Sequence, residues 1–135
     1  MDQKNHPLTL TEWQTLSLYF ELIALSLDAG LDFITALEEL IKLDHPKNRK
    51  SSLNNSFSRL LSNLHIGKTK KEALGNFYND LPHPLIETFC QSLLLGWEQG
   101  ISVSAILRKQ AEQIRTETYF KLEKEAQMKQ LKLLL

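Results

Sequence analysis

The stretch "HIGKTKKEAL", residues 65–74, has two interpretations, and the choice between them decides the fold. Its G-K-T matches the end of the nucleotide-binding loop G-x-x-x-x-G-K-[ST], but the position of the first glycine holds Ser62. That loop also follows a buried strand, whereas the apolar residues of 53–64 fall on one helical face. The alternative is a helix that ends at Gly67 and a second helix capped by Thr69, whose T-x-x-E forms a capping box. We therefore predict a helical turn and no nucleotide site.

The same pattern occurs three times in the chain, each time beginning with a glycine. "GLDFITAL", "GKTKKEAL" and "GISVSAIL" align without gaps as G-x-[DTS]-x-x-x-[AI]-L, at spacings of 37 and 33 residues. Glycine accepts the left-handed conformation in which helices commonly end. Two residues later, a side-chain oxygen can accept a hydrogen bond from the free amides of the next helix. We predict three tight reversals, with turn and cap residues at Gly30 and Asp32, Gly67 and Thr69, and Gly100 and Ser102.

Three reversals make six helices, and no segment shows the two-residue alternation of a strand. We predict an all-α six-helix bundle built from three antiparallel hairpins. The first helix carries one apolar stripe that includes Trp13 and Phe20, and a second with Leu18, Leu22 and Leu25. Such a helix is central in the bundle or is covered by a partner. The helices are expected at residues 11–29, 33–43, 53–65, 70–78, 85–98 and from 103 past 128.

The last of these helices differs from the others. Beyond Leu107 its apolar residues become sparse and its charges dense, so we expect much of it to be solvated and to project from the bundle. The sequence then closes on "KQLKLLL", with rising apolarity. We expect a hydrophobic segment to begin at this end.

Composition excludes several classes of protein. Sixteen basic and sixteen acidic residues cancel among 135, so no broad charge attracts nucleic acid. The single cysteine, Cys90, lies in an apolar run and is expected to be buried; it fits a reducing compartment. No apolar run approaches the ~20 residues of a membrane span, and the first ten residues are no secretory signal. These features favour one domain with a modest core.

The residues that usually carry chemistry form no recognisable site. The four histidines show no metal-ligand spacing; His65 is expected near a helix end and His83, between two prolines, in a loop. The acidic residues of the last helix alternate with Lys and Arg, as on a solvated face. We expect no metal, no cofactor and no enzymatic activity.

The chain resembles the F domain of the type II secretion system. "AGLDF" followed by Ala36-Leu37, and Gly67 followed by Glu72-Ala73-Leu74, match the hairpin motifs of that family. The C-terminal part, with Ala111-Glu112, Arg115 and the lysines before Leu133-Leu134, is similar to the TadC-like branch of Tad (tight adherence) and Flp type IV pilus systems. The resemblance extends over residues 16–135.

The resemblance implies a cytoplasmic domain of an inner-membrane platform protein, beside a secretion or pilus-assembly ATPase and other platform subunits. It implies a tail over residues 1–10, a helical platform domain over 11–128 and a membrane-proximal segment over 129–135. The full-length protein would be embedded in the bacterial inner membrane, with this chain at its cytoplasmic face as a possible homo- or hetero-oligomer. The long C-terminal helix would lead toward a membrane span just beyond Leu135. Candidate ATPase contacts are Lys47, Arg49, Lys50, Lys68, Lys70 and Lys71, and the candidate membrane-proximal cations are Lys124, Lys129 and Lys132.

Two other functions stay open on the sequence. The repeat period also suits a soluble helical-repeat scaffold for protein–protein interaction, although the tetratricopeptide signature is absent. Tight helix–glycine–helix turns also occur in helix-turn-helix DNA-binding proteins, for which the lysines near Gly67 would supply a small basic patch.

Overall fold

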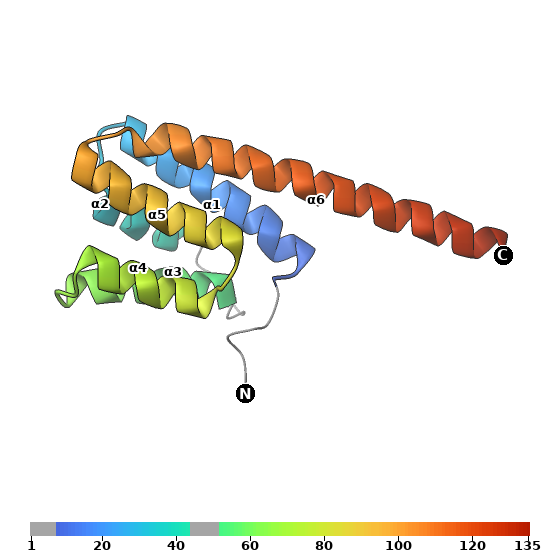
Figure 1. The fold of residues 1–135 in the computed structure, drawn as a ribbon, viewed down its shortest axis with the longest axis horizontal. Helices are drawn as coiled ribbons and strands as arrows, with labels where there is room; N and C mark the ends of the chain where they lie inside the picture. Colours follow the sequence, from blue (N-terminus) through green and yellow to red (C-terminus); the bar gives the residue numbers. More distant parts are fainter. Residues whose placement is uncertain (1–7, 44–51) are drawn as a thin grey trace.

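The computed structural model describes residues 8–43 and 52–135, and every regular element in these two segments is a helix (Figure 1). The all-α prediction of six helices is confirmed, and most boundaries fall within two residues of those expected. The last helix, expected to continue past residue 128, ends at Leu134. The elements are α1 (Leu10–Asp28), α2 (Phe33–Leu43), α3 (Ser52–His65), α4 (Lys70–Asp80), α5 (Pro84–Gln99) and α6 (Val103–Leu134).

The three glycines reverse the chain between α1 and α2, α3 and α4, and α5 and α6. Their φ angles are 100°, 97° and 70° for Gly30, Gly67 and Gly100. At Gly30 the Leu31 amide donates to Ser26 and the Gly30 amide to Leu27, the Schellman pattern, and the same two bonds recur around Gly67. Gly100 instead makes the single bond of the simpler left-handed motif. Each predicted reversal is therefore made by backbone hydrogen bonds that a positive φ permits.

Of the three helices that begin after a glycine turn, two are capped by the residue that the G-x-[DTS] pattern predicts. The Asp32 carboxylate accepts the Thr35 amide at 2.8 Å, and Thr69 forms a complete capping box with Glu72. Ser102 occupies the N-cap of α6, but its side chain makes no capping bond, so that expectation is wrong.

The start of α6 is stabilised from another helix. The Ser102 hydroxyl lies 3.3 Å from that of Ser104. Asp28, at the end of α1, accepts a hydrogen bond from Ser104 and forms an ion pair with Arg108. A carboxylate at this place also faces the positive end of the α6 dipole. The charge that favours this helix start therefore comes from a contact between helices.

One histidine, expected in a loop, caps a helix instead. His83 is the N-cap of α5, and its Nδ1 accepts the Leu85 amide at 3.1 Å. The Trp13 ring meets the imidazole edge-on at 4.6 Å. Pro84 follows at the first helical position, where a missing amide hydrogen costs nothing. A polar residue directly before a helix-starting proline is the signal that could have predicted this.

The core lies between α1, α5 and the α3–α4 hairpin. The Phe20 ring stacks on Phe89 at 4.6 Å, and Phe57 meets Tyr19 and Phe77 edge-on. These five rings are fully or almost fully buried. The apolar positions that periodicity assigned to the inner faces therefore form one continuous aromatic centre.

The second apolar stripe of α1 faces outward. Leu18 and Leu25 are 51% and 60% exposed, and Leu22 is only partly buried. Helix α1 packs most extensively against α6 and also against α2, and Leu22 packs against the core, but the described residues leave Leu18 and Leu25 uncovered. Helix α1 is therefore central in the bundle, as the first interpretation has it, while Leu18 and Leu25 stay exposed on its outer side; coverage by a partner stays a prediction.

Helix α6 leaves the bundle, as predicted. Its last buried residue is Thr118, and every later residue is exposed. We call residues 119–134 the α6 arm; at 1.5 Å per residue it is about 24 Å long. Figure 1 shows it extending well past the other helices, toward the end marked C. None of the helices in the described segments combines the length and apolarity that crossing a bilayer requires.

Candidate partner-binding surface

The three glycine turns lie together at one end of the bundle, the end opposite the α6 arm (Figure 1). We call this the turn end; it comprises residues 29–32, 66–69 and 100–102. Each turn exposes one apolar side chain beside its glycine, with exposed fractions of 37% for Leu31, 72% for Ile66 and 44% for Ile101. These three aliphatic side chains share one end of the bundle, which makes that end a candidate partner-binding surface.

The turn end is held together by the last turn of α5. The Trp97 ring meets Phe33 edge-on at 5.2 Å, and the Lys70 ammonium nitrogen lies 4.9 Å from its centre. At Gly96, an added Cβ would lie 2.4 Å from the Cγ2 of Val103. Phe33, Lys70 and Val103 are the first residues of α2, α4 and α6. The helices that follow the three turns therefore all start against the same two residues of α5.

The candidate ATPase contacts divide into three groups. Lys68 and Lys71 are exposed at the α3–α4 turn and make no ion pair with another described residue. Lys70 is engaged with Trp97, which leaves it less available to a partner. Lys47, Arg49 and Lys50 lie outside the described residues.

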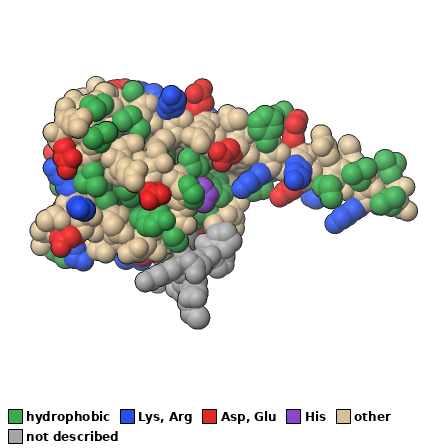
Figure 2. Space-filling view, in the orientation of Figure 1, with side chains coloured by type: hydrophobic (Ala, Val, Ile, Leu, Met, Phe, Trp, Pro, Cys, Tyr) green, Lys and Arg blue, Asp and Glu red, His purple; other side chains and the backbone are tan. Residues whose placement is uncertain are grey.

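A cleft opens at the turn end between the α1–α2 and α5–α6 turns. It has a volume of about 430 Å³, with Leu27, Phe33 and Trp97 in its wall and Asp28 and Asp32 among its polar residues. Figure 2 shows apolar side chains interspersed with charged ones over this end of the bundle. Both carboxylates already have partners in the chain, Arg108 for Asp28 and the Thr35 amide for Asp32, so the cleft offers a partner chiefly its apolar wall.

Helices α1 and α6 are joined by two ion pairs. Asp28 pairs with Arg108 and Glu21 with Arg115, so the two pairs lie seven residues apart on each antiparallel helix. Hydrogen bonds from Ser104 and Arg108 lower the pKa of the Asp28 carboxyl below its ordinary value. Its charge, and hence its pair with Arg108, persists through the physiological range.

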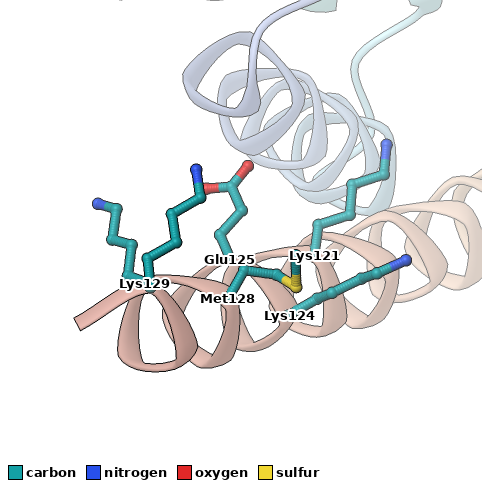
Figure 3. A pocket seen from close by; sticks show the side chains of 6 residues that line it. Lys121, Lys124, Glu125, Met128 and Lys129 are labelled. Atoms are coloured by element: carbon teal, nitrogen blue, oxygen red, sulfur yellow. The ribbon is translucent and has the colours of Figure 1, made fainter. Parts of the chain in front are cut away.

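The predicted membrane-proximal cations all lie on the α6 arm. Lys124, Lys129 and Lys132 are exposed, and Lys121, which the sequence analysis did not single out, lies beside them (Figure 3). They surround Met128 and Glu125 on one side of the helix. The arm therefore displays a basic face at the end of the molecule farthest from the turn end.

Reactive groups are few in the described parts of the chain. Burial raises the pKa of the Cys90 thiol to about 12, and its Sγ donates weakly to the Leu74 carbonyl at 3.5 Å. No cluster of three potential metal-ligating side chains occurs among the described residues. The Arg59–Asp80 pair joins α3 to α4, and the His65–Glu38 contact joins α3 to α2. These contacts connect helices and assemble no reactive constellation.

A family model connects this arrangement with known proteins. The model described as "Type II secretion system (T2SS), protein F" matches residues 19–135. The chain belongs to this family. Members of the T2SS protein F family are inner-membrane platform components of secretion and pilus systems, and their role is structural rather than enzymatic. Neither a search of curated proteins nor one of solved structures found a match.

Proposed function

We propose that the chain is the cytoplasmic domain of a T2SS protein F-type platform protein in a type II secretion or Tad-type pilus machine, and that its turn end binds the assembly ATPase. The observation that carries the proposal is that the two ends of the molecule present different surfaces. Exposed Leu31, Ile66 and Ile101 lie at one end with Lys68 and Lys71, while the basic α6 arm leaves from the other. A platform domain needs one surface toward its motor and another toward the membrane.

The bundle is suited to passing a load between its two ends. The first residues of α2, α4 and α6 meet at Gly96 and Trp97, so a push on the turn end reaches all three helices. Helix α6 runs 32 residues without a break and is tied to α1 by two ion pairs. In this proposal residues 11–128 form the platform domain, and residues 129–135 begin the membrane-proximal segment.

Binding to the purified cognate ATPase tests the proposal. The variant Ile66→Ser/Lys68→Glu/Lys71→Glu changes exposed positions only and should weaken binding by at least about tenfold, as loss of a central contact cluster does. The matched control Lys121→Glu/Lys124→Glu alters two cations on the α6 arm and should bind like the wild type. Equal affinities of both variants and the wild type would refute the turn-end assignment.

The cations outside the described residues need a separate variant. Lys47→Glu/Arg49→Glu/Lys50→Glu changes that cluster alone. A loss of ATPase affinity in this variant, with none in the turn-end variant, would move the proposed contact from the turn end to residues 47–50.

A further inference from the structure

The lysines of the α6 arm form one face of the helix. Lys121, Lys124, Lys129 and Lys132 recur at spacings of three, five and three residues, which places them on one side of an α-helix. Their side chains and Met128 line a shallow open hollow of about 380 Å³ (Figure 3). We call this the lysine face. Its floor consists largely of methylene stems and the Met128 thioether, while the ammonium groups lie at its rim.

The lysine face has little opposing charge within the molecule. Glu125 is the only acidic residue lining the hollow, and none of the four lysines is ion-paired with another described residue. The arm carries these four lysines and two glutamates, Glu123 and Glu125, a net charge of +2. Since the whole chain is neutral, the remainder carries −2. An anionic surface would attract the arm and repel the rest.

Exposed apolar side chains also lie along the arm, interspersed with polar ones such as Glu123. Tyr119, Leu122, Ala126 and Leu133 recur at helical spacing and are exposed, with Leu122 at 42% and Leu133 at 86%. Figure 2 shows basic and apolar side chains side by side along this extension. Because exposed Phe120, Leu131 and Leu134 lie on a further side of the helix, the arm is not a two-faced amphipathic helix, and its attraction to the lipid–water boundary of an anionic membrane is chiefly electrostatic. Lysine stems suit that place because they cover apolar surface while their charges stay in water.

We propose that the lysine face binds the anionic headgroups of membrane phospholipids and thereby sets the orientation of the bundle at the membrane surface. The inference rests on the proposed function only in placing the arm toward the inner membrane; the lipid chemistry follows from the charges on the arm. A juxtamembrane lysine contributes about fivefold to binding at an anionic surface. Four of them give a contact that is strong at low salt and weak at high salt.

Vesicle binding of the 135-residue chain tests this inference. Vesicles of phosphatidylcholine alone are compared with vesicles containing one-third phosphatidylglycerol, with flotation as the readout. The wild type should bind the anionic vesicles at least about tenfold more tightly, and about 0.5 M salt should remove the difference. The variant Lys121→Gln/Lys124→Gln/Lys129→Gln/Lys132→Gln should bind both kinds of vesicle at the neutral level. All four positions are exposed, so circular dichroism should show an unchanged fold.

A matched variant separates local placement from overall charge. Lys42→Gln/Lys68→Gln/Lys71→Gln/Lys109→Gln also removes four exposed cations, but from α2, the turn end, the start of α4 and the body of α6. It should retain most of the preference for anionic vesicles. Equal binding of the wild type to neutral and anionic vesicles, or an equal loss in both variants, would overturn the inference.

The lysine-face variant should still bind the ATPase with wild-type affinity. Failure of the lipid contact and failure of the turn-end contact would therefore be observed in different assays and with different variants.

Discussion

The Lys70 ammonium nitrogen lies 4.9 Å from the centre of the Trp97 ring. This contact joins the start of α4 to the end of α5, and the neighbouring Gly96 lets the start of α6 approach the same place. The turn end is thus organised by two consecutive residues of α5, although neither belongs to the repeated glycine pattern.

Replacing Gly96 with alanine should destabilise the protein. The new Cβ would lie 2.4 Å from Val103 Cγ2 and 3.2 Å from the Ile101 carbonyl oxygen, so the start of α6 must shift. Overpacking of this kind costs about 1–3 kcal/mol of unfolding free energy, measured by urea denaturation. The double variant Gly96→Ala/Val103→Ala should recover part of the loss.

Gly75→Ala is the matched control, because Gly75 lies in α4 with nothing within 4 Å of the added atom. It should raise stability by about 0.5–1 kcal/mol through helix propensity. If Gly96→Ala were stabilising to the same extent, the close approach of α5 and α6 would be refuted.

Acidification should weaken the protein through His83. Burial lowers the pKa of its imidazole below the ordinary 6.5; nearby Glu117 opposes this shift and Lys121 adds to it. The folded protein therefore binds fewer protons than the unfolded chain as the pH falls through 6.5. The contribution of His83 to stability is complete above that pH and is lost as the pH falls toward the folded pKa.

Protonation also removes the Nδ1 acceptor that caps α5, and a helix cap is worth about 1 kcal/mol. Urea denaturation at pH 7.5 and pH 5.5 measures the difference. His83→Asn keeps a capping acceptor but has no titrating group, so its stability should change less over that interval. An identical pH dependence in the variant would show that other groups are responsible.

Gln110 should be replaceable with a gain in stability. It is 5% exposed, and neither atom of its side-chain amide has a hydrogen-bond partner among the described residues. An unsatisfied buried amide costs about 1–3 kcal/mol, so Gln110→Leu should raise the unfolding free energy by about 1 kcal/mol. Gln113→Leu, on the exposed side of the same helix, should change it by less than about 0.5 kcal/mol. A destabilised Gln110→Leu protein would imply that the amide is satisfied in solution.

Removing most of the α6 arm should leave the bundle intact. No residue beyond Thr118 is buried, so a chain ending at Leu122 should melt within about 2 °C of the full chain. A chain ending at Gln113 also loses buried Ile114 and Thr118 and should be destabilised by at least about 2 kcal/mol. A large loss in the first truncation would show that the arm packs against the bundle.

Local chemistry explains how much of the fold was predictable. The three reversals depend on a glycine that can adopt positive φ, and two of the caps depend on a side chain two residues later, so both follow from short stretches of sequence. The Ser102 hydroxyl lies beside that of Ser104 and makes no capping bond, and the carboxylate near the start of α6 is that of Asp28, 74 positions earlier in the sequence. No local pattern contains that information.

The candidate surface was less predictable than the fold. Clusters of lysine in the sequence indicated basic patches, but only the packing of α4 against α5 showed that Lys70 is engaged with Trp97. Exposed Leu31, Ile66 and Ile101 also come from three separate turns, and their gathering at one end depends on how the hairpins associate. Such juxtapositions arise from tertiary packing, which periodicity alone does not specify.

The Asp28–Arg108 and Glu21–Arg115 ion pairs lie about two helical turns apart, and this spacing has a mechanical consequence. If α6 slid along its axis by seven residues, Arg108 would come level with Glu21, while Asp28 and Arg115 would each lose its counter-ion. Axial sliding is therefore opposed by the loss of both pairs and, more strongly, by the extensive packing of α1 against α6, because half-exposed ion pairs contribute little by themselves. The free end of α6 should thus behave as a lever whose displacement follows the bundle to which it is clamped.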